Sequence, residues 1–280
     1  MPSRADDPPF RRIGIVGLGL IGGSIALAAR RAWADVEIIG VDRAHVAEGA
    51  RASGVVDATR KAASELADAD LIVLATPVQE IIEEIATLGR AGVLAVVTDV
   101  GSTKRQVMAA ATAAGLTRFV GGHPIAGSER GGLSHARADL FDGRTWALVG
   151  GDRGPLVESF VTALGARARH TDGESHDRTM AFVSHAPQVI ASALMAAAGH
   201  GVGRAGLDWS GQGFSDMTRL ASSPGAVWEG ILATNADFIT EAIAAVMSQL
   251  PATPRDLSDR SRIQRLFADA ASWREQRFPT

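Results

Sequence analysis

The sequence predicts an α/β fold in which an N-terminal, doubly wound parallel sheet is followed by an all-helical domain. Apolar runs of strand length alternate with helical stretches through the first 170 residues, and strand signals then stop near Thr171. Continuous apolar strands that alternate with helices are typical of a parallel sheet covered on both faces. A length of 280 residues agrees with two domains. We place them at residues 1–171 and 172–280.

Six apolar runs are predicted to form strands of the sheet. They cover residues 12–17, 36–42, 70–77, 93–100, 118–124 and 145–150. After the third run, Thr76 can cap a helix, Pro77 takes its first position and Gln79 is placed for a capping box. Apolar side chains then recur at helical spacing over residues 81–88, which predicts a helix between the third and fourth strands.

Three long, alanine-rich stretches are predicted to form the helical domain. They cover residues 175–199, 225–249 and 256–274. Pro187 lies inside the first stretch and is expected to kink it, because proline lacks the N–H that continues a helix. These stretches are apolar on more than one side, so we expect them to pack against a second subunit and form a homodimer.

The composition excludes several classes of function. A net charge of −3 gives no reason to expect nucleic acid or an anionic membrane as a partner. No uninterrupted apolar run reaches the roughly 18 residues that span a bilayer, and the polar N-terminus carries no apolar signal segment. We therefore expect a cytoplasmic protein. The absence of cysteine excludes disulfides, thiolate zinc sites and a cysteine nucleophile, and no His and carboxylate cluster indicates a metal site.

A glycine-rich turn follows the first predicted strand and opens the first helix. Gly17, Gly19 and Gly22 form the G-x-G-x-x-G pattern, with Leu20 and Ile21 between the second and third glycines. Glycines there allow a tight turn and a close approach of the backbone to a pyrophosphate, which the helix N-terminus then binds. This is the sequence pattern of a Rossmann-type dinucleotide site.

An acidic residue stands where such a site needs one. Asp42 ends the second strand, 20 positions after Gly22, where a carboxylate meets a ribose 2′-hydroxyl. A carboxylate repels a 2′-phosphate, so NAD is favoured over NADP, although the adjacent Arg43 leaves room for NADP. Thr76 and Pro77, at the same edge of the sheet, complete the predicted cofactor site. The alternative is a tight structural turn with an unrelated aspartate.

Three polar clusters follow the nucleotide site. The first is the segment "DVGSTK" with Ser102, the second is His123 with Ser128 and Glu129, and the third joins Ser184-His185 to "GFSDMTRL" at residues 213–220. Ligands of open parallel sheets bind beyond the carboxyl ends of the strands. Because Ser102 and His123 both follow strands, both can face the nicotinamide.

Taken together, these segments resemble the prephenate/arogenate (cyclohexadienyl) dehydrogenase family of tyrosine biosynthesis. The resemblance covers nearly the whole chain and rests on "GLGLIGGS", "LATP", "TDVGSTK", "GGHPIAGSERGG", "TMAFVSHAPQ" and "GFSDMTRLASSPGAVW", in that order. It implies oxidative decarboxylation: a 4-hydroxycyclohexadiene bearing a ring carboxylate gives hydride from C4 to NAD, loses CO2 and becomes aromatic. The product is 4-hydroxyphenylpyruvate from prephenate, or tyrosine from arogenate.

The resemblance also implies a role for each catalytic group. His123 matches the catalytic histidine, a base that accepts the C4 hydroxyl proton near pH 7. Ser102 matches the serine that orients this hydroxyl, although the same serine could instead cap the helix that follows it. Because aromatisation drives the reaction, the protein mainly has to position its substrate.

Four further residues are implied to bind the substrate. Arg219 matches the arginine that holds a carboxylate, for which a guanidinium is suited because it can bond bidentately. His185 contacts the substrate or is a buried core histidine, and Trp228 packs at the edge of the cleft. Ser128 and Glu129 contact the substrate, or Glu129 pairs across the cleft with Arg219.

Two departures from the family pattern affect the substrate, and two other functions remain open. Gln212 stands where the family has glycine, and Gln188 ends a segment that usually reads S-H-L-P-H. Both changes leave room for a relative that acts on 4-amino-4-deoxyprephenate. A non-catalytic NAD-binding sensor is the other alternative. A β-hydroxyacid dehydrogenase is disfavoured because it needs a lysine in the helical region, whereas Lys61 and Lys104 both lie in the first domain.

Overall fold

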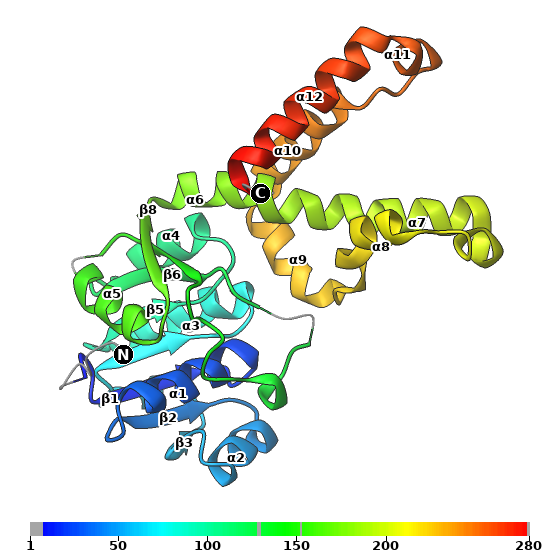
Figure 1. The fold of residues 1–280 in the computed structure, drawn as a ribbon. Coiled ribbons are helices and arrows are strands. Elements are labelled where there is room, and N and C mark those ends of the chain that lie inside the picture. Colours follow the sequence, from blue (N-terminus) through cyan, green and yellow to red (C-terminus); the bar gives the residue numbers. More distant parts are fainter. Residues whose placement is uncertain (1–7, 128–129, 152, 279–280) are drawn as a thin grey trace.

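An eight-stranded sheet forms the first part of the molecule, and helices form the rest (Figure 1). The computed structural model describes residues 8–127, 130–151 and 153–278. The strands are β1 (Arg12–Val16), β2 (Glu37–Val41), β3 (Ala58–Arg60), β4 (Leu71–Leu74), β5 (Val96–Asp99), β6 (Phe119–Pro124), β7 (Thr145–Val149) and β8 (Arg167–Thr171). Their order across the sheet is β3-β2-β1-β4-β5-β6-β7-β8. Strands β2 and β3 are added on one side of β1, and β4 to β8 are added on its other side, so the strand order reverses between β1 and β4.

The helices of the first part cover both faces of this sheet, as predicted. They are α1 (Leu20–Ala32), α2 (Ala44–Ala52), α3 (Val78–Ala91), α4 (Arg105–Ala113) and α5 (Gly154–Ala163), with a 3-10 turn η1 (Ala63–Glu65). Buried side chains of α1, α2 and α5 share one apolar cluster, and those of α3 and α4 share another. The doubly wound arrangement follows from these two separate cores.

The sheet departs from the predicted all-parallel form at one end. β6 pairs antiparallel with β7, whereas β7 and β8 are parallel. The connection between β6 and β7 carries only the 3-10 turn η2 (Leu133–His135) in its described part. A parallel return needs a crossover, usually a helix. Without one, the chain returns antiparallel.

Two strands have no apolar run in the sequence, and both lie at the edges of the sheet. β3 has three half-buried residues, and β8 reads RARHT with its side chains mostly exposed. Edge strands pack on few neighbours, so hydrophobic patterning does not mark them.

The second part of the chain is helical throughout its described residues. Its elements are α6 (Gly173–Met180), the π-helical turn η3 (Ala181–His185), α7 (Ala186–Leu207), α8 (Gln212–Thr218), the 3-10 turn η4 (Arg219–Ser222), α9 (Gly225–Thr234), α10 (Ala236–Gln249), α11 (Pro254–Ser258) and α12 (Arg260–Arg277). The irregularity expected at Pro187 takes the form of η3, directly before the proline. A wider π turn accommodates a ring that would clash with the preceding helical turn.

The predicted helix over residues 225–249 is two helices. α9 and α10 meet at an angle of 98°. Asn235 lies between them, fully buried and outside helical geometry. Its side-chain amide donates to the backbone carbonyl of Asp177 and accepts from Arg105, so tertiary contacts override the helical propensity of the surrounding alanines.

Much of the helical part is apolar and exposed. Figure 1 shows one arm of α7 and α8 and another of α10 to α12, both extending away from the sheet. Val202, Trp209, Phe267 and Trp273 are among the exposed side chains of these arms, and no residue of α12 is buried. The helical stretch from Gly173 to Leu207, which is broken at Gly203, is long and apolar enough to cross a membrane by length and composition, although no uninterrupted apolar run in the sequence indicated it.

Candidate active site

The three glycines of the first turn serve different purposes. Gly17 has a φ of +93°, and a Cβ there would lie 2.7 Å from the carbonyl of Ala75. A Cβ at Gly22 would lie 1.9 Å from the carbonyl oxygen of Gly17. A Cβ at Gly19, by contrast, would meet nothing within 4 Å. The first and third glycines therefore close the turn, and the space at Gly19 leaves the backbone accessible to a phosphate.

The side chain of Asp42 is held beside this turn by hydrogen bonds from the backbone. Its carboxylate accepts from the backbone N–H of Leu18 at 2.7 Å and from that of Arg43 at 2.6 Å. A carboxylate offers about four acceptor positions, so two remain for a ribose diol. The hydroxyl of Thr76, at the adjoining end of β4, is buried with no hydrogen-bond partner among the described residues. The open turn, the held carboxylate and the unpartnered hydroxyl fit a bound dinucleotide.

The other predicted cofactor residues lie around the same turn. Leu20 and Ile21 are half-buried in the first turn of α1. Pro77 is exposed and precedes α3, and the side chain of Arg43 is 81% exposed. Its Nε lies 3.8 Å from Oδ1 of Asp42, so the guanidinium is exposed beside the carboxylate predicted to meet the ribose.

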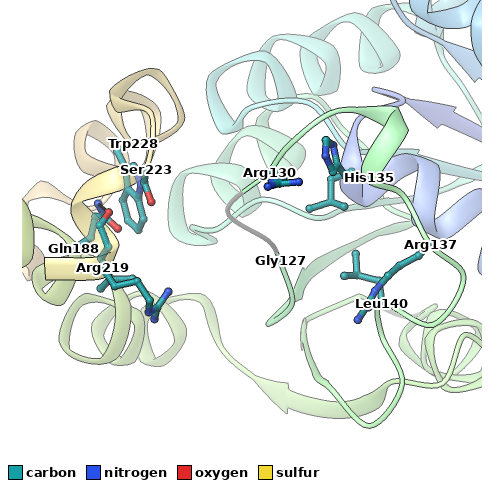
Figure 2. Close-up of a pocket in the computed structure, with 11 residues that line it drawn as sticks. Gly127, Arg130, His135, Arg137, Leu140, Gln188, Arg219, Ser223 and Trp228 are labelled. Carbon is teal, nitrogen blue, oxygen red and sulfur yellow. Dashed lines mark hydrogen bonds between the residues drawn. The ribbon is translucent and has the colours of Figure 1, made fainter. Parts of the chain in front are cut away.

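A cavity of about 670 Å³ separates the sheet from the helices (Figure 2). Its residues from the first part are Leu20, Gly127, Arg130, His135, Arg137 and Leu140, and those from the helices are Gln188, Arg219, Leu220, Ser223 and Trp228. Figure 2 shows Arg219 and Gln188 on one side and Arg130 and Arg137 across from them. Three guanidinium groups make the cavity suited to an anionic ligand.

His123 lies on β6 with 7% of its surface exposed, beyond the residues that line this cavity. Its Nδ1 is 2.9 Å from Nε2 of His176, and Nδ1 of His176 is 2.8 Å from the Asp177 carboxylate. Sequence reasoning missed His176 and Asp177. An adjacent His-Asp pair at the start of a polar helix was the available signal, but nothing in the sequence places it beside β6.

The glycines before His123 allow the end of β5 to approach β6 closely. A Cβ at Gly122 would lie 2.4 Å from the backbone oxygen of Asp99. The ladder between β5 and β6 ends at Thr98 and Val120. Beyond it, the Asp99 carboxylate accepts from the Gly122 N–H at 3.0 Å, and the Lys104 ammonium donates to the Gly122 carbonyl at 2.8 Å. This buried ion pair therefore holds the backbone from which His123 projects.

Burial keeps His123 and His185 neutral. The pKa of His123 lies well below its usual 6.5, because burial penalises the cation and because His176 and Lys104 lie nearby. Burial also lowers the pKa of His185 to about 4, against the opposing effect of Asp177. At pH 7 the imidazole of His123 is a neutral group that can accept a proton.

Ser102 is half-buried in the turn between β5 and α4, and it does not cap α4. The Asp177 carboxylate takes that role, accepting from the backbone N–H groups of Lys104 at 2.6 Å and Arg105 at 2.9 Å. Within the described parts of the chain, the Ser102 hydroxyl makes no hydrogen bond. The capping interpretation is therefore wrong, and the hydroxyl is available to a ligand.

His185 is buried at the end of η3, where one ring nitrogen contacts the protein and the other is left for a ligand. Its Nδ1 lies 3.2 Å from the Asn235 amide nitrogen, whereas its Nε2 is buried without a partner among the described residues. Its ring meets that of Trp228 edge to face, with centroids 6.1 Å apart. Trp228 thus connects His185 to the cavity.

Two of the predicted substrate residues, Ser128 and Glu129, lie outside the described residues. Within the described ranges, no group of three or more His or carboxylate side chains could hold a metal ion.

Fold and site together define a nucleotide-dependent dehydrogenase with a helical second part. The family model described as the prephenate dehydrogenase nucleotide-binding domain matches residues 25–168. The model described as the prephenate dehydrogenase dimerization domain matches residues 172–267. The chain belongs to the prephenate dehydrogenase family.

Individual relatives agree with this assignment. The chain is 32% identical over 246 residues to a prephenate dehydrogenase of Lactococcus lactis, covering 84% of this chain and 68% of the relative. The structure is similar to that of Aquifex aeolicus prephenate dehydrogenase in complex with hydroxyphenyl propionate and NAD+, at 28% identity and a TM-score of 0.85 over 95% of this chain and 97% of that one. Synechocystis arogenate dehydrogenase gives 26% identity and a TM-score of 0.81, over 95% and 100% of the two chains.

Proposed function

We propose that this protein catalyses the NAD-dependent oxidative decarboxylation of prephenate or arogenate. The observation that carries the proposal is a neutral, buried His123 at the end of β6, backed by His176 and Asp177, at the same carboxyl edge of the sheet as the open glycine turn after β1. Family membership supplies the reaction class. In this reaction the C4–H bond breaks with its electron pair as hydride, the C4 hydroxyl gives its proton to the base, the bond to the ring carboxylate supplies its electron pair to the ring as CO2 leaves, and the phenolate oxygen takes a proton back.

NAD accepts the hydride when it is bound. The glycine turn with Leu20 and Ile21 would hold its pyrophosphate, Asp42 and Arg43 would hold the adenosine ribose, and Thr76 and Pro77 would line the rest of the cofactor site. His123 accepts the hydroxyl proton, a step for which a placed base is worth about 10²- to 10⁴-fold in rate. Because its imidazole is neutral well below pH 6.5, the base is present throughout the physiological range.

The remaining residues bind and orient the substrate. Ser102 orients the ring hydroxyl, and His185 offers its unpartnered Nε2 to a substrate oxygen. Arg219, at the cavity wall, holds a carboxylate, for which a charged hydrogen bond contributes about 1.5–3 kcal/mol. Ser128 and Glu129, in the loop after β6, are proposed to contact the same ligand.

We propose further that residues 1–171 and 172–280 are the two domains, and that the helical domain forms a homodimer. In the most apolar window of the helix from Gly173 to Leu207, 28% of the residues are buried in one copy. A second copy would cover the exposed apolar side chains of α7 and α12, in keeping with a region that matches a dimerization domain. A dimer of this kind acts in the cytoplasm.

The test is the initial rate of NADH formation with prephenate and with arogenate, each measured against NAD and NADP. Turnover of either substrate with NAD is expected. His123→Asn should lower kcat by about 10²- to 10⁴-fold with NAD affinity unchanged, because it removes only the base. Arg219→Gln should mainly raise KM for the substrate. No turnover of either compound by a protein that binds NAD would refute the proposal and direct attention to 4-amino-4-deoxyprephenate.

A further inference from the structure

We propose that Asp177, His176 and Asn235 are positioning residues that fix the tautomers of two histidines in opposite senses. Nε2 of His123 is left without a proton, and Nε2 of His185 carries one. This inference deepens the proposed function, on which it rests, because it explains why one histidine accepts a proton and the other donates a hydrogen bond.

The first chain of hydrogen bonds runs from Asp177 to His123. A carboxylate only accepts, so Nδ1 of His176, at 2.8 Å, carries the proton. In a neutral His176 the other nitrogen, Nε2, is therefore an acceptor, and Nδ1 of His123 donates to it at 2.9 Å. The proton of a neutral His123 thus lies on Nδ1, and its Nε2 presents a lone pair.

The charge of Asp177 is compensated by groups other than His176. The carboxylate already accepts two N–H groups from the N-terminus of α4, and the Arg105 guanidinium lies 3.6 Å from it. A helix N-terminus and a cation together compensate the negative charge.

The second chain runs from the backbone carbonyl of Asp177 to His185. Asn235 Nδ2 donates to this carbonyl at 2.8 Å, and Asn235 Oδ1 accepts from Arg105 at 3.2 Å. Because a carbonyl only accepts and a guanidinium only donates, these two bonds fix the orientation of the amide.

The second N–H of the same amide then decides the tautomer of His185. Nδ1 of His185 lies 3.2 Å from Asn235 Nδ2, so it can only accept. The proton of the neutral ring is therefore on Nε2, which is buried without a partner among the described residues. A buried, unpartnered N–H costs free energy unless a ligand satisfies it, so His185 Nε2 is a donor for a substrate oxygen.

The experiment is long-range 1H–15N correlation of the full-length protein labelled with [15N]-histidine, near pH 7.5. The chain has 7 histidines, and single His→Gln variants assign them. We expect His123 as the Nδ1–H tautomer and His185 as the Nε2–H tautomer. Free histidine side chains favour Nε2–H, so the result at His123 is diagnostic. A proton on Nε2 of His123, or a bare Nε2 at His185, would overturn the inference.

Variants test whether the relays cause these tautomers. His176→Leu should move the His123 proton to Nε2 and lower kcat by about 10²- to 10⁴-fold, while the dissociation constant for NAD stays unchanged. The matched control is His170→Gln, because His170 is exposed on β8 and pairs only with Glu158 among the described residues. An unchanged His123 tautomer in a folded His176→Leu protein would refute the first relay.

Asn235→Asp tests the second relay, since a carboxylate facing Nδ1 of His185 can only accept and should draw the proton there. Persistence of Nε2–H in a folded Asn235→Asp protein would refute that relay. If this variant does not fold, the wild-type spectrum still decides. The spectra are independent of turnover: the expected tautomers without activity would overturn the proposed function alone, whereas activity with the opposite tautomers would overturn only this inference.

Discussion

Replacing Lys104 with methionine should destabilise the protein strongly, because it strands a buried carboxylate. Lys104 and Asp99 are both fully buried and paired with each other. Methionine keeps the volume of the aliphatic stem but removes the cation and the hydrogen bond to the Gly122 carbonyl, which is 2.8 Å from the ammonium. Removing one partner of a buried pair typically costs about 3–5 kcal/mol. We expect a loss of that size in the free energy of unfolding.

The assay is equilibrium urea unfolding at a fixed protomer concentration, since the stability of an oligomer depends on it. The double variant Asp99→Asn, Lys104→Met removes both charges and keeps an acceptor for the Gly122 N–H. It should therefore be more stable than Lys104→Met alone, by about 1–3 kcal/mol. Lys61→Met is the matched control, because Lys61 is the other lysine of the chain and is exposed. A Lys104→Met protein within about 1 kcal/mol of wild type would refute the reasoning.

Three further outcomes are expected. Asp42→Ala should weaken NAD binding and narrow the difference in KM between NAD and NADP, and an unaltered preference would remove Asp42 from the ribose. Gly122→Ala should cost about 1–3 kcal/mol in urea unfolding, because its Cβ would lie 2.4 Å from the Asp99 oxygen. The free energy of unfolding should fall as the pH drops from 6.5 to 4, because the unfolded chain then binds a proton that folded His185, with its pKa near 4, does not. This histidine alone lowers the free energy of unfolding by about 3 kcal/mol at pH 4, and His123 acts in the same direction. A free energy of unfolding that stays constant over that range would contradict burial of the neutral forms.

The core of the fold could be predicted because its strands carry their signal locally. The runs that become β1, β2 and β4 to β7 are buried over most of their length, so most of their residues are apolar and the pattern is plain. β8 lies at an edge and carries no such pattern. The antiparallel direction of β7 depends on the structure of the connection between β6 and β7. The sequence of that loop does not show whether the next strand runs parallel or antiparallel.

The residues of the site likewise fall into those that local sequence predicts and those that depend on distant contacts. The G-x-G-x-x-G turn and Asp42 were predictable because a fixed spacing along one βαβ unit determines their geometry. His176, Asp177 and Asn235 were missed because their partners are far away in the sequence: Asp177 bonds Lys104, and Asn235 bonds Asp177. The break at Asn235 in particular looks like ordinary helix until the tertiary contact is known.

The cap of α4 has a consequence for how the chain reaches its native state. The residue that satisfies the first amides of α4 lies 73 positions after Lys104, in another part of the fold. Without Asp177 the N–H groups of Lys104 and Arg105 lack this acceptor, so we expect the helix to fray at its first turn until α6 is in place. The same carboxylate orients the histidines of the site. Catalytic competence therefore appears together with the docking of the two halves, so a truncated or partly made chain could bind dinucleotide before it can turn over substrate.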